Sequence, residues 1–491
     1  MVVGREGGVG NSLASRFGKE KKLEKNTRAI EVKNLSFRYK KRNFLSLKQV
    51  SFSFQNSLLI SGASGSGKST VVRILNGLIP HLFEGERRGN VNVLGMDPLG
   101  YPLSHLSKKI GTLLQDYESS FFCNTVEEEM YFSLKWRDKI SDVDKVIQNV
   151  LDYFSIVHLR KRKIRNLSSG EKQKVALATL FLTQPKVFIL DEPLSNLDKD
   201  SKKEILNYLK KLKEESILIM TSHRFLHLQS IFDSFLILKD GKSKFFRDER
   251  DIFKQKKFVE DCGVRISSLD FNEKKAEFNG LPPLLVGRKI TFRNNGEKIL
   301  DNIDIELYPG CITVLTGPNG SGKTTLAKIL SGLLNPNSGS VYLKGRPFGK
   351  PTGKSVGFVF QNPLHQFFTS RVKDEIMWGI KNSGVKNHYV EELFEALDIV
   401  PLLDKNCFNL SWGEMERVAI ASILALNPDV IILDELTQGQ DTIHLLKIFN
   451  YLRKLKSEGC AILLITHDED IIKTGANRVL KLEEGKIEEI G

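Results

Sequence analysis

Two glycine-rich segments of the chain have the residue types that bind phosphate groups. They read GASGSGKS at 62–69 and GPNGSGKT at 317–324. Each follows an apolar run typical of a strand and precedes a run with helical periodicity. The glycines let the backbone wrap around a phosphate, and the N-terminus of the following helix attracts negative charge. The lysine of each segment, Lys68 or Lys323, would neutralise phosphate oxygens. The hydroxyl residue after it, Ser69 or Thr324, would face Mg²⁺.

A pair of acidic residues ends an apolar strand in each half of the chain. VFIL precedes Asp191-Glu192, and VIIL precedes Asp434-Glu435. Two carboxylates at the end of a buried strand are costly unless a cation lies near them. We expect the aspartates to hold Mg²⁺, through water, and the glutamates to polarise an attacking water molecule as general bases. The alternative, a helix-capping acid, is weakened because both halves repeat the pair.

These residues belong to a long internal repeat. The segment GEKQKVALATLFLTQPKVFILDE at 170–192 matches GEMERVAIASILALNPDVIILDE at 413–435. The copies are 243 residues apart (413 minus 170), which is far longer than a solenoid unit, so each copy is a whole domain. Each copy reads strand, glycine loop, helix and later a buried strand, which predicts an α/β fold with a mostly parallel sheet. Helical periodicity with few strand signals predicts a helical insert at 126–166 and at 371–409.

Composition sets the boundaries of the predicted segments. Residues 1–28 are rich in Gly, Lys, Arg and Glu, without the apolar stretch of a secretory signal, and predict a basic tail. A charged stretch that ends in Gly-Leu-Pro-Pro predicts a linker. The expected segments are therefore a tail at 1–28, a first domain at 29–250, a linker at 251–283 and a second domain at 284–491.

Several classes of protein are excluded by composition and length. The chain has 491 residues, too many for one compact core, and 41% of them are apolar, which excludes a largely disordered chain. Its longest nearly apolar run, VAIASILAL, has nine residues, whereas a spanning helix needs about 20. The five scattered cysteines fit a reducing compartment. A net charge of +14 permits nucleic acid, an anionic membrane face or polyphosphate ligands, and does not choose among them.

Three further elements recur in the same order in both halves. A glutamine ends a short strand, a Leu-Ser-x-Gly sequence opens an apolar helix, and a histidine follows a later strand; these are Gln115 and Gln361, Leu167–Gly170 and Leu410–Gly413, and His223 and His467. With this order the sequence resembles an ATP-binding cassette (ABC) ATPase with two cassettes in one chain. The resemblance implies two P-loop NTPase domains, each with a RecA-like, mostly parallel core, an antiparallel sheet and a helical signature subdomain.

The resemblance also implies two composite ATP sites, because cassettes of this family bind head to tail. The phosphate loop of one cassette then faces the signature of the other. Site one would combine Gln115, Asp191, Glu192 and His223 with Ser411, Gly413 and the loop Gly62, Ala63, Ser64, Gly65, Ser66, Gly67, Lys68, Ser69 and Thr70. Site two would combine Gln361, Asp434, Glu435 and His467 with Ser168, Gly170 and the loop Gly317, Pro318, Asn319, Gly320, Ser321, Gly322, Lys323, Thr324 and Thr325. The two glutamines would also touch Mg²⁺, the cofactor expected with ATP.

Loop sequences narrow the branch. NPLHQFFTSRVKDEIMWG after Gln361, and DYESSFFCNTVEEEMYFSL after Gln115, are similar to the energy-coupling factor (ECF) importer ATPases. That branch implies vitamin or transition-metal uptake, a separate membrane scaffold subunit, a substrate-binding membrane subunit, and a prokaryotic chain on the cytoplasmic face of the cell membrane without a nucleic-acid partner. A twin-cassette sugar importer ATPase and a soluble ribosome-associated twin-cassette ATPase are the alternatives.

The two copies also differ. Tyr39 matches the adenine-stacking aromatic of the family, whereas Asn294 takes its place in the second copy. Trp412 replaces a signature glycine, and Gln440 replaces a usual leucine. Both copies carry an aromatic pair at the entry to the helical insert, Phe121-Phe122 and Phe367-Phe368, which predicts either the core of the insert or the exposed rim of a groove for a partner helix.

Overall fold

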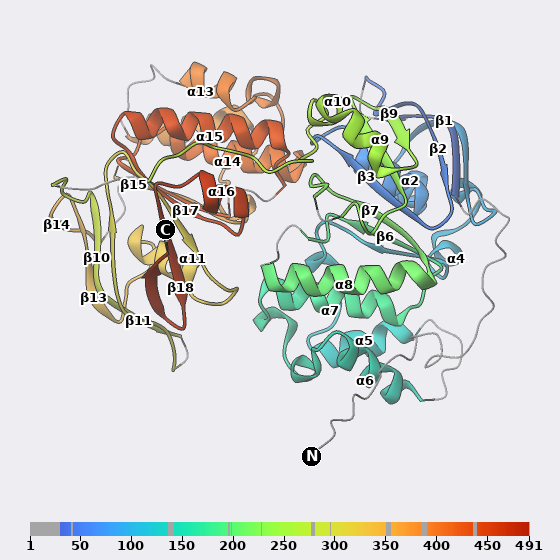
Figure 1. Cartoon of the computed structure of the whole chain (residues 1–491), viewed down its shortest axis with the longest axis horizontal. Helices are drawn as coiled ribbons and strands as arrows, with labels where there is room; N and C mark the ends of the chain where they lie inside the picture. The colour runs from blue at the N-terminus through green and yellow to red at the C-terminus, as the bar shows by residue number, and fades with distance from the viewer. Residues whose placement is uncertain are drawn as a thin grey trace, which may run out of the picture.

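The computed structural model describes residues 30–40, 43–135, 142–194, 197, 199–226, 228–275, 280–294, 296–349, 355–383, 390–435 and 439–490. The predicted tail at 1–28 lies outside these ranges. Two bodies of similar architecture lie side by side, the first blue to green and the second yellow to red (Figure 1). The predicted α/β fold with two cassettes is confirmed.

Each cassette is built on a six-stranded sheet whose strands are parallel except for one edge strand. In the first cassette the order is β5-β6-β7-β3-β8-β9, from Ile110–Leu113, Val187–Asp191, Ile217–Thr221, Ser57–Gly62, Ser234–Lys239 and Lys242–Phe246. In the second it is β15-β16-β17-β12-β18-β19, from Val356–Val359, Val430–Asp434, Ala461–Ile465, Ile312–Thr316, Arg478–Glu483 and Lys486–Glu489.

A smaller antiparallel sheet covers one side of each cassette. In the first cassette its order is β2-β1-β4, from Leu47–Phe54, Ile30–Tyr39 and Gly85–Val93. In the second it is β11-β10-β13-β14, from Glu297–Leu307, Leu285–Asn294, Ser338–Leu343 and Arg346–Pro347. Apolar side chains of this sheet pack with one face of the six-stranded sheet in a common core.

The helices complete each cassette. The first contains α2 (Lys68–Leu75), α3 (Leu78–His81), α4 (Leu103–Leu106), α5 (Val126–Leu134), α6 (Val143–Tyr153), α7 (Ser169–Leu182), α8 (Lys199–Glu215), α9 (Glu249–Lys254) and α10 (Lys256–Glu260). The second contains α11 (Lys323–Leu330), α12 (Val372–Ser383), α13 (Val390–Ala396), α14 (Trp412–Leu424), α15 (Thr442–Ser457) and α16 (Glu469–Thr474). The predicted helical inserts correspond to α5–α6 and α12–α13.

The central strands are buried on both faces, which explains their uninterrupted apolar sequences. In β6, Val187 and Ile189 pack toward the antiparallel sheet, whereas Phe188 and Leu190 pack toward the helices of the insert. This alternation follows from the two-residue period of a strand. The strand thus fixes the position of the acidic pair that follows it.

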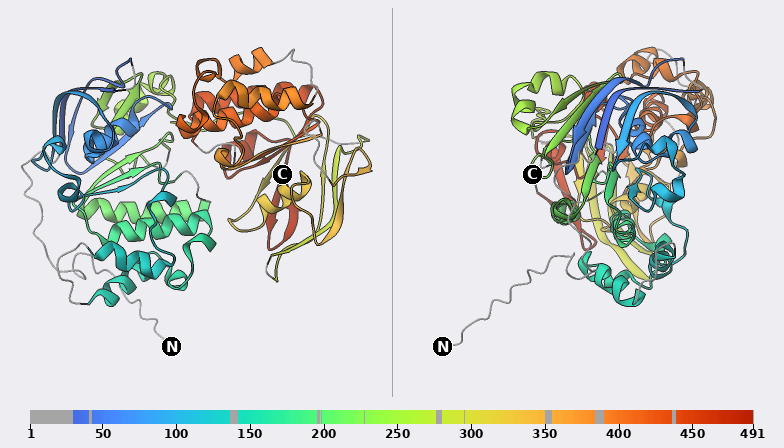
Figure 2. Two further views of the ribbon diagram at one scale, coloured as in Figure 1. Left: turned by 180° about the vertical axis from the view of Figure 1, so that it is seen from behind. Right: turned by 90° about the vertical axis from the view of Figure 1, so that its right-hand side faces the viewer.

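The cassettes are arranged head to tail. In Figure 1 the helical insert lies at the bottom of the first cassette and at the top of the second, and Figure 2 shows the same relation from behind. After α10 the chain crosses into the second cassette and runs beside α15 (Figure 1). Phe271 of this crossing segment is buried against Phe449 of α15, with ring centroids 4.3 Å apart. The boundaries assigned to the linker, 251–283, stay a prediction.

Candidate active site

The two phosphate loops join β3 to α2 and β12 to α11, as predicted. In each, the lysine donates hydrogen bonds to two carbonyl groups of its own loop: Lys68 Nζ lies 2.9 Å from Gly62 O, and Lys323 Nζ lies 2.8 Å from Gly317 O. Gly62 has a φ of 151°, and a Cβ atom there would lie 2.2 Å from Leu238 O. The backbone of the loop therefore requires glycine at this position, and the wrapped loop leaves its N–H groups at the start of a helix.

Each acidic pair lies at the carboxyl end of its buried strand, beside the predicted histidine. His223 Nε2 lies 3.5 Å from Glu192 Oε1, and His467 Nε2 lies 3.4 Å from Glu435 Oε1. Both glutamates adopt left-handed backbone conformations, with φ of 52° and 59°. A non-glycine residue in this region costs about 1–3 kcal/mol and is concentrated at functional sites. The strained backbone therefore lowers stability and places the glutamate carboxylate beside the histidine in each cassette.

Burial sets the protonation of these groups. It raises the pKa of Glu192 to about 7, against an opposing attraction from Lys68. It raises the pKa of Glu435 to about 8, where the neighbouring Asp434 adds to the effect. Burial also lowers the pKa of His223 to about 3, so this ring is neutral at physiological pH. A carboxylate with a pKa near neutrality is suited to accept a proton from water.

The residues beside the loops fit a bound Mg²⁺. Thr324 Oγ1 donates a 2.7 Å hydrogen bond to Asp434 Oδ2, and the other oxygen, Oδ1, is buried without a hydrogen-bond partner in the described part of the chain. Mg²⁺ binds through one or two carboxylates together with substrate phosphates, so a hydroxyl and one carboxylate are sufficient protein ligands. Thr324 and Asp434 would hold the ion in the second cassette, where it would neutralise phosphate charge. Within the described residues, no cluster of three acidic, histidine or cysteine side chains offers a richer site.

The equivalent residues of the first cassette are Ser69 and Asp191. Here the aspartate accepts a hydrogen bond from Thr221 Oγ1, and the same hydroxyl accepts one of 3.0 Å from Glu192 N. Thr221 ends β7, the strand that neighbours β6. The two candidate metal sites therefore have the same donor types with different hydrogen bonds.

Each signature sequence faces the phosphate loop of the other cassette. A Cβ atom on Gly170 would lie 3.4 Å from Asn319 Nδ2, and one on Gly413 would lie 3.5 Å from Ser64 Oγ. Ser168 and Ser411 are the N-caps of α7 and α14, each in a capping box with the glutamate three residues later. Two helix N-termini therefore converge on each candidate site, one from each cassette, which suits a ligand with several negative charges.

The remaining predicted residues surround this arrangement. Gln115 follows β5 and Gln361 follows β15, the edge strands of the two six-stranded sheets. Tyr39 ends β1, where its hydroxyl lies 3.2 Å from Thr70 Oγ1 at the start of α2. Asn294 ends β10 at the equivalent place in the second cassette. Aromatic and amide side chains thus occupy corresponding positions beside the two loops.

Comparison with known proteins agrees with this geometry. A family model described as ABC transporter matches residues 47–195 and 300–438. The chain belongs to the ABC transporter family. A putative ABC transporter ATP-binding protein of Methanosarcina acetivorans is 32% identical over 94% of this chain and 90% of its own length. A putative HMP/thiamine import ATP-binding protein, YkoD, of Bacillus subtilis is 30% identical over 93% of this chain and 89% of its own length.

Solved structures share the fold. An archaeal ribosome recycling factor, in complex with a ribosomal stalk protein, has a TM-score of 0.64 and 22% identity over 92% of this chain and 89% of that chain. A structure named RNase-L Inhibitor has the same TM-score and identity over 94% and 90%. At this identity the likeness establishes the fold. Together with the family match, the two phosphate loops identify this ABC protein as an ATPase.

Two residues of this ABC ATPase that lie at the contact between the cassettes were missed by the sequence analysis. Asp441 Oδ2 accepts a 2.7 Å hydrogen bond from Ser64 N, in the phosphate loop of the opposite cassette. His444 Nδ1 lies 2.8 Å from the same oxygen and holds the carboxylate in place. A signal was present in the sequence, because an aspartate stands six residues after the glutamate of the acidic pair in both copies.

Gln366 was also missed, although it lies in the loop after Gln361 that resembles ECF importer ATPases. Its amide nitrogen donates hydrogen bonds to Ala419 O and Ser422 Oγ of α14, at 2.7 and 2.8 Å. These bonds fasten the segment after Gln361 to the signature helix. Gln440, one of the departures from the family pattern, donates to Gly413 O at 2.9 Å and to Glu416 Oε2 at 2.8 Å. It therefore ties the loop that carries Asp441 to the start of α14.

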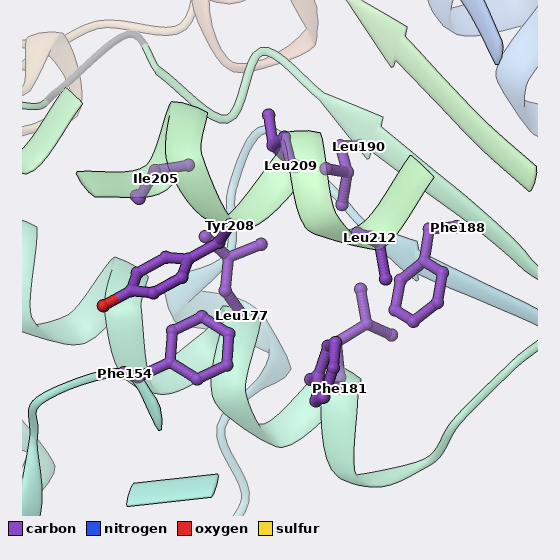
Figure 3. A pocket seen from close by; sticks show the side chains of 10 residues that line it. Phe154, Leu177, Phe181, Phe188, Leu190, Ile205, Tyr208, Leu209 and Leu212 are labelled. Carbon is purple, nitrogen blue, oxygen red and sulfur yellow. The ribbon is translucent and has the colours of Figure 1, made fainter. Parts of the chain in front are cut away.

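A small cavity elsewhere in the first cassette is unsuited to nucleotide. It lies between α7 and α8 and is lined by apolar and aromatic side chains, with the hydroxyl of Tyr208 pointing away from it (Figure 3). Rings such as those of Phe154 and Phe181 fill its walls. Without polar groups, this space cannot hold phosphate or purine edges, and it belongs to the packing of the helical part.

Proposed function

We propose that this chain is the ATP-hydrolysing subunit of an ECF-type importer, bound at the cytoplasmic face of the cell membrane to a membrane scaffold subunit and a substrate-binding subunit. Glu192 and Glu435 act as general bases toward water, and His223 and His467 hold those carboxylates. ATP lies between each phosphate loop and the opposite signature. In the described residues no helix is both long and apolar enough to cross a bilayer, so transport requires a separate membrane partner.

The observation that carries the proposal is a matched pair of exposed aromatic rings. Phe122 is 76% exposed and Phe368 is 78% exposed, each in the segment after the predicted glutamine. Their neighbours Phe121 and Phe367 pack against the core. One ring of each pair therefore packs in the core and the other is exposed, and its role in binding a partner helix stays a prediction. Exposed aromatic rings at equivalent places on both cassettes fit a partner that contacts both.

The backbone that carries each exposed ring is held by a buried carboxylate. Phe122 N donates a 2.9 Å hydrogen bond to Glu129 Oε2, and Phe368 N donates a 3.0 Å hydrogen bond to Glu375 Oε2. Both glutamates are buried. Each carboxylate therefore holds the backbone of the turn in place, with the phenylalanine ring on the outside. A rigid aromatic residue loses little conformational freedom on binding, which favours affinity for an amphipathic helix.

The surroundings of the two rings differ. Phe368 stacks on Trp378, with ring centroids 5.7 Å apart, and Phe122 lies 5.5 Å from Phe132. The segment after the first ring is joined to an exposed basic segment, Lys161–Lys163, because Ile164 N donates a hydrogen bond to Asn124 O. Two different coupling helices of a scaffold fit these two surfaces, one of them with acidic residues.

Phe122→Asp and Phe368→Asp test this function. A buried aromatic at a binding hot spot contributes 2 kcal/mol or more, so each variant is expected to lose about 30-fold or more in affinity for membranes that contain the native scaffold. ATPase activity of the isolated chain should survive. Leu99→Asp is the matched control, because Leu99 is 47% exposed but lies beside the antiparallel sheet. Equal membrane binding by all three variants would reject the proposed docking surface.

The named relative directs the choice of substrate. The B. subtilis protein is described as a putative HMP/thiamine importer ATPase. HMP and thiamine are therefore the first substrates to test in uptake assays, with transition-metal ions as the comparison set. Uptake that requires this chain and its two glutamates, in cells that express the membrane subunits, is the expected result.

A further inference from the structure

The segment that crosses between the cassettes is hydrogen-bonded to the candidate active site of the first one. Arg265 N donates a 2.9 Å hydrogen bond to His223 O, and Phe225 N donates one of 2.9 Å to Arg265 O. These two bonds form a short parallel bridge. Gly263 O, two residues earlier, accepts a 3.4 Å hydrogen bond from Thr442 N of the second cassette. The crossing segment is thus part of the interface between the cassettes.

The side chain of Arg265 reaches the histidine loop of the second cassette. Its guanidinium donates to both carboxylate oxygens of Asp468, at 2.7 and 2.9 Å, and to Asp470. Asp468 immediately follows His467 and caps α16. Arg224, which follows His223, donates a 2.6 Å hydrogen bond to the same aspartate. One arginine of the crossing segment therefore contacts both histidine loops, one through its backbone and the other through its side chain.

The Arg265–Asp468 ion pair is buried, so the loss of either partner is costly. Arg265 is 7% exposed and Asp468 is 1% exposed. A bidentate, charge-assisted pair has a fixed geometry, and removing one partner from a buried pair leaves an uncompensated charge. The segment continues into the second cassette, where Leu269 N donates to Asp470 Oδ2 at 2.6 Å and Phe271 enters the core. Arg265 therefore sits at a rigid junction.

We propose that Arg265 is a positioning residue for ATP hydrolysis. It connects the two histidine loops, so that the glutamate carboxylates of both sites are positioned together. This inference rests on the proposed roles of His223 and His467. A loss of the contact misaligns both loops without removing a ligand of ATP.

Arg265→Met in the full chain tests the inference. A misplacement of about 1 Å at a catalytic group can cost 10²-fold, so kcat is expected to fall about 10- to 100-fold while KM for ATP stays within about threefold. Arg265→Lys keeps the charge but not the bidentate geometry and should recover part of kcat. Arg87→Met is the control, because Arg87 makes a bidentate pair of the same chemistry with Asp97 inside the first cassette, although the Asp97 side chain is 42% exposed. A fall in kcat of equal size in the control would overturn the proposal.

A second comparison separates positioning from folding. Asp468→Asn should reproduce the fall in kcat from the other side of the contact, in a chain whose melting curve shows that it is still folded at the assay temperature. In a chain that already carries His223→Ala and His467→Ala, Arg265→Met should have little further effect, because the two changes act through the same loops. Multiplicative effects would refute the coupling. Normal activity of the histidine variants themselves would instead refute the proposed histidine roles.

Discussion

Gly263 offers a sharp test of how the crossing segment supports site one. Its φ is 77°, and a Cβ atom there would lie 2.8 Å from Ala63 Cβ in the phosphate loop. Ordinary contact begins at 3.4 Å, so Gly263→Ala requires a displacement of 0.6 Å (3.4 minus 2.8). The left-handed backbone adds a conformational cost of roughly 1–2 kcal/mol for alanine. Because a Cβ atom cannot rotate out of the way, the phosphate loop and the crossing segment must shift relative to each other.

A displacement of this size should lower kcat about tenfold, since about 1 Å can cost 10²-fold. Gly95→Ala is the matched control: its φ is 83°, and a Cβ there meets no atom within 4 Å. Both variants should lose thermal stability from the left-handed backbone, and Gly263→Ala should lose more because of its contact with Ala63, which a melting curve measures. Only Gly263→Ala should also lose ATPase activity in a steady-state assay. If both variants retain the same kcat, the crossing segment does not support the phosphate loop.

Further predictions concern the chemistry itself. Glu192→Gln with Glu435→Gln should lower kcat by about 10²–10⁴-fold and keep ATP binding, and normal turnover would contradict their role as bases. The glutamates have pKa values of about 7 and 8 and must be ionised to act, so kcat/KM should rise between pH 6 and 9 and then level off. His223, with a pKa of about 3, stays neutral over that range, and a flat profile would exclude the raised carboxyl pKa values. Tyr39→Ala, measured in a Lys323→Ala chain, should weaken ATP binding about 5- to 150-fold if stacking contributes about 1–3 kcal/mol; unchanged affinity would argue against stacking.

The local parts of the site were predictable from sequence because short-range rules produce them. The glycines of the phosphate loops serve positive φ angles, and the apolar runs before Asp191 and Asp434 serve strands buried on both faces. Each motif carries its own strand, turn or helix signal. Duplication in one chain then strengthened every assignment.

The contacts between cassettes were not predictable in the same way. Arg265 stands in a charged stretch that reads as a linker, and its partner Asp468 lies 203 residues later. No periodicity relates such residues, since only the head-to-tail arrangement brings them together. The aromatic pairs show a second limit: two adjacent phenylalanines have the same composition, and the anchoring of the turn by Glu129 decides which ring points outward.

The contact between Arg224 and Asp468 also determines which halves can assemble. His223 and His467 are equivalent in the repeat, so the residues that follow them are equivalent too, and they meet each other across the boundary. Two copies of the first half would bring arginine against arginine at this place, and two copies of the second half would bring aspartate against aspartate. Like charges in contact disfavour a wrong partner. The charges at this contact therefore favour pairing of a first half with a second half. When the halves are expressed as separate chains, they should form mixed pairs in preference to identical ones.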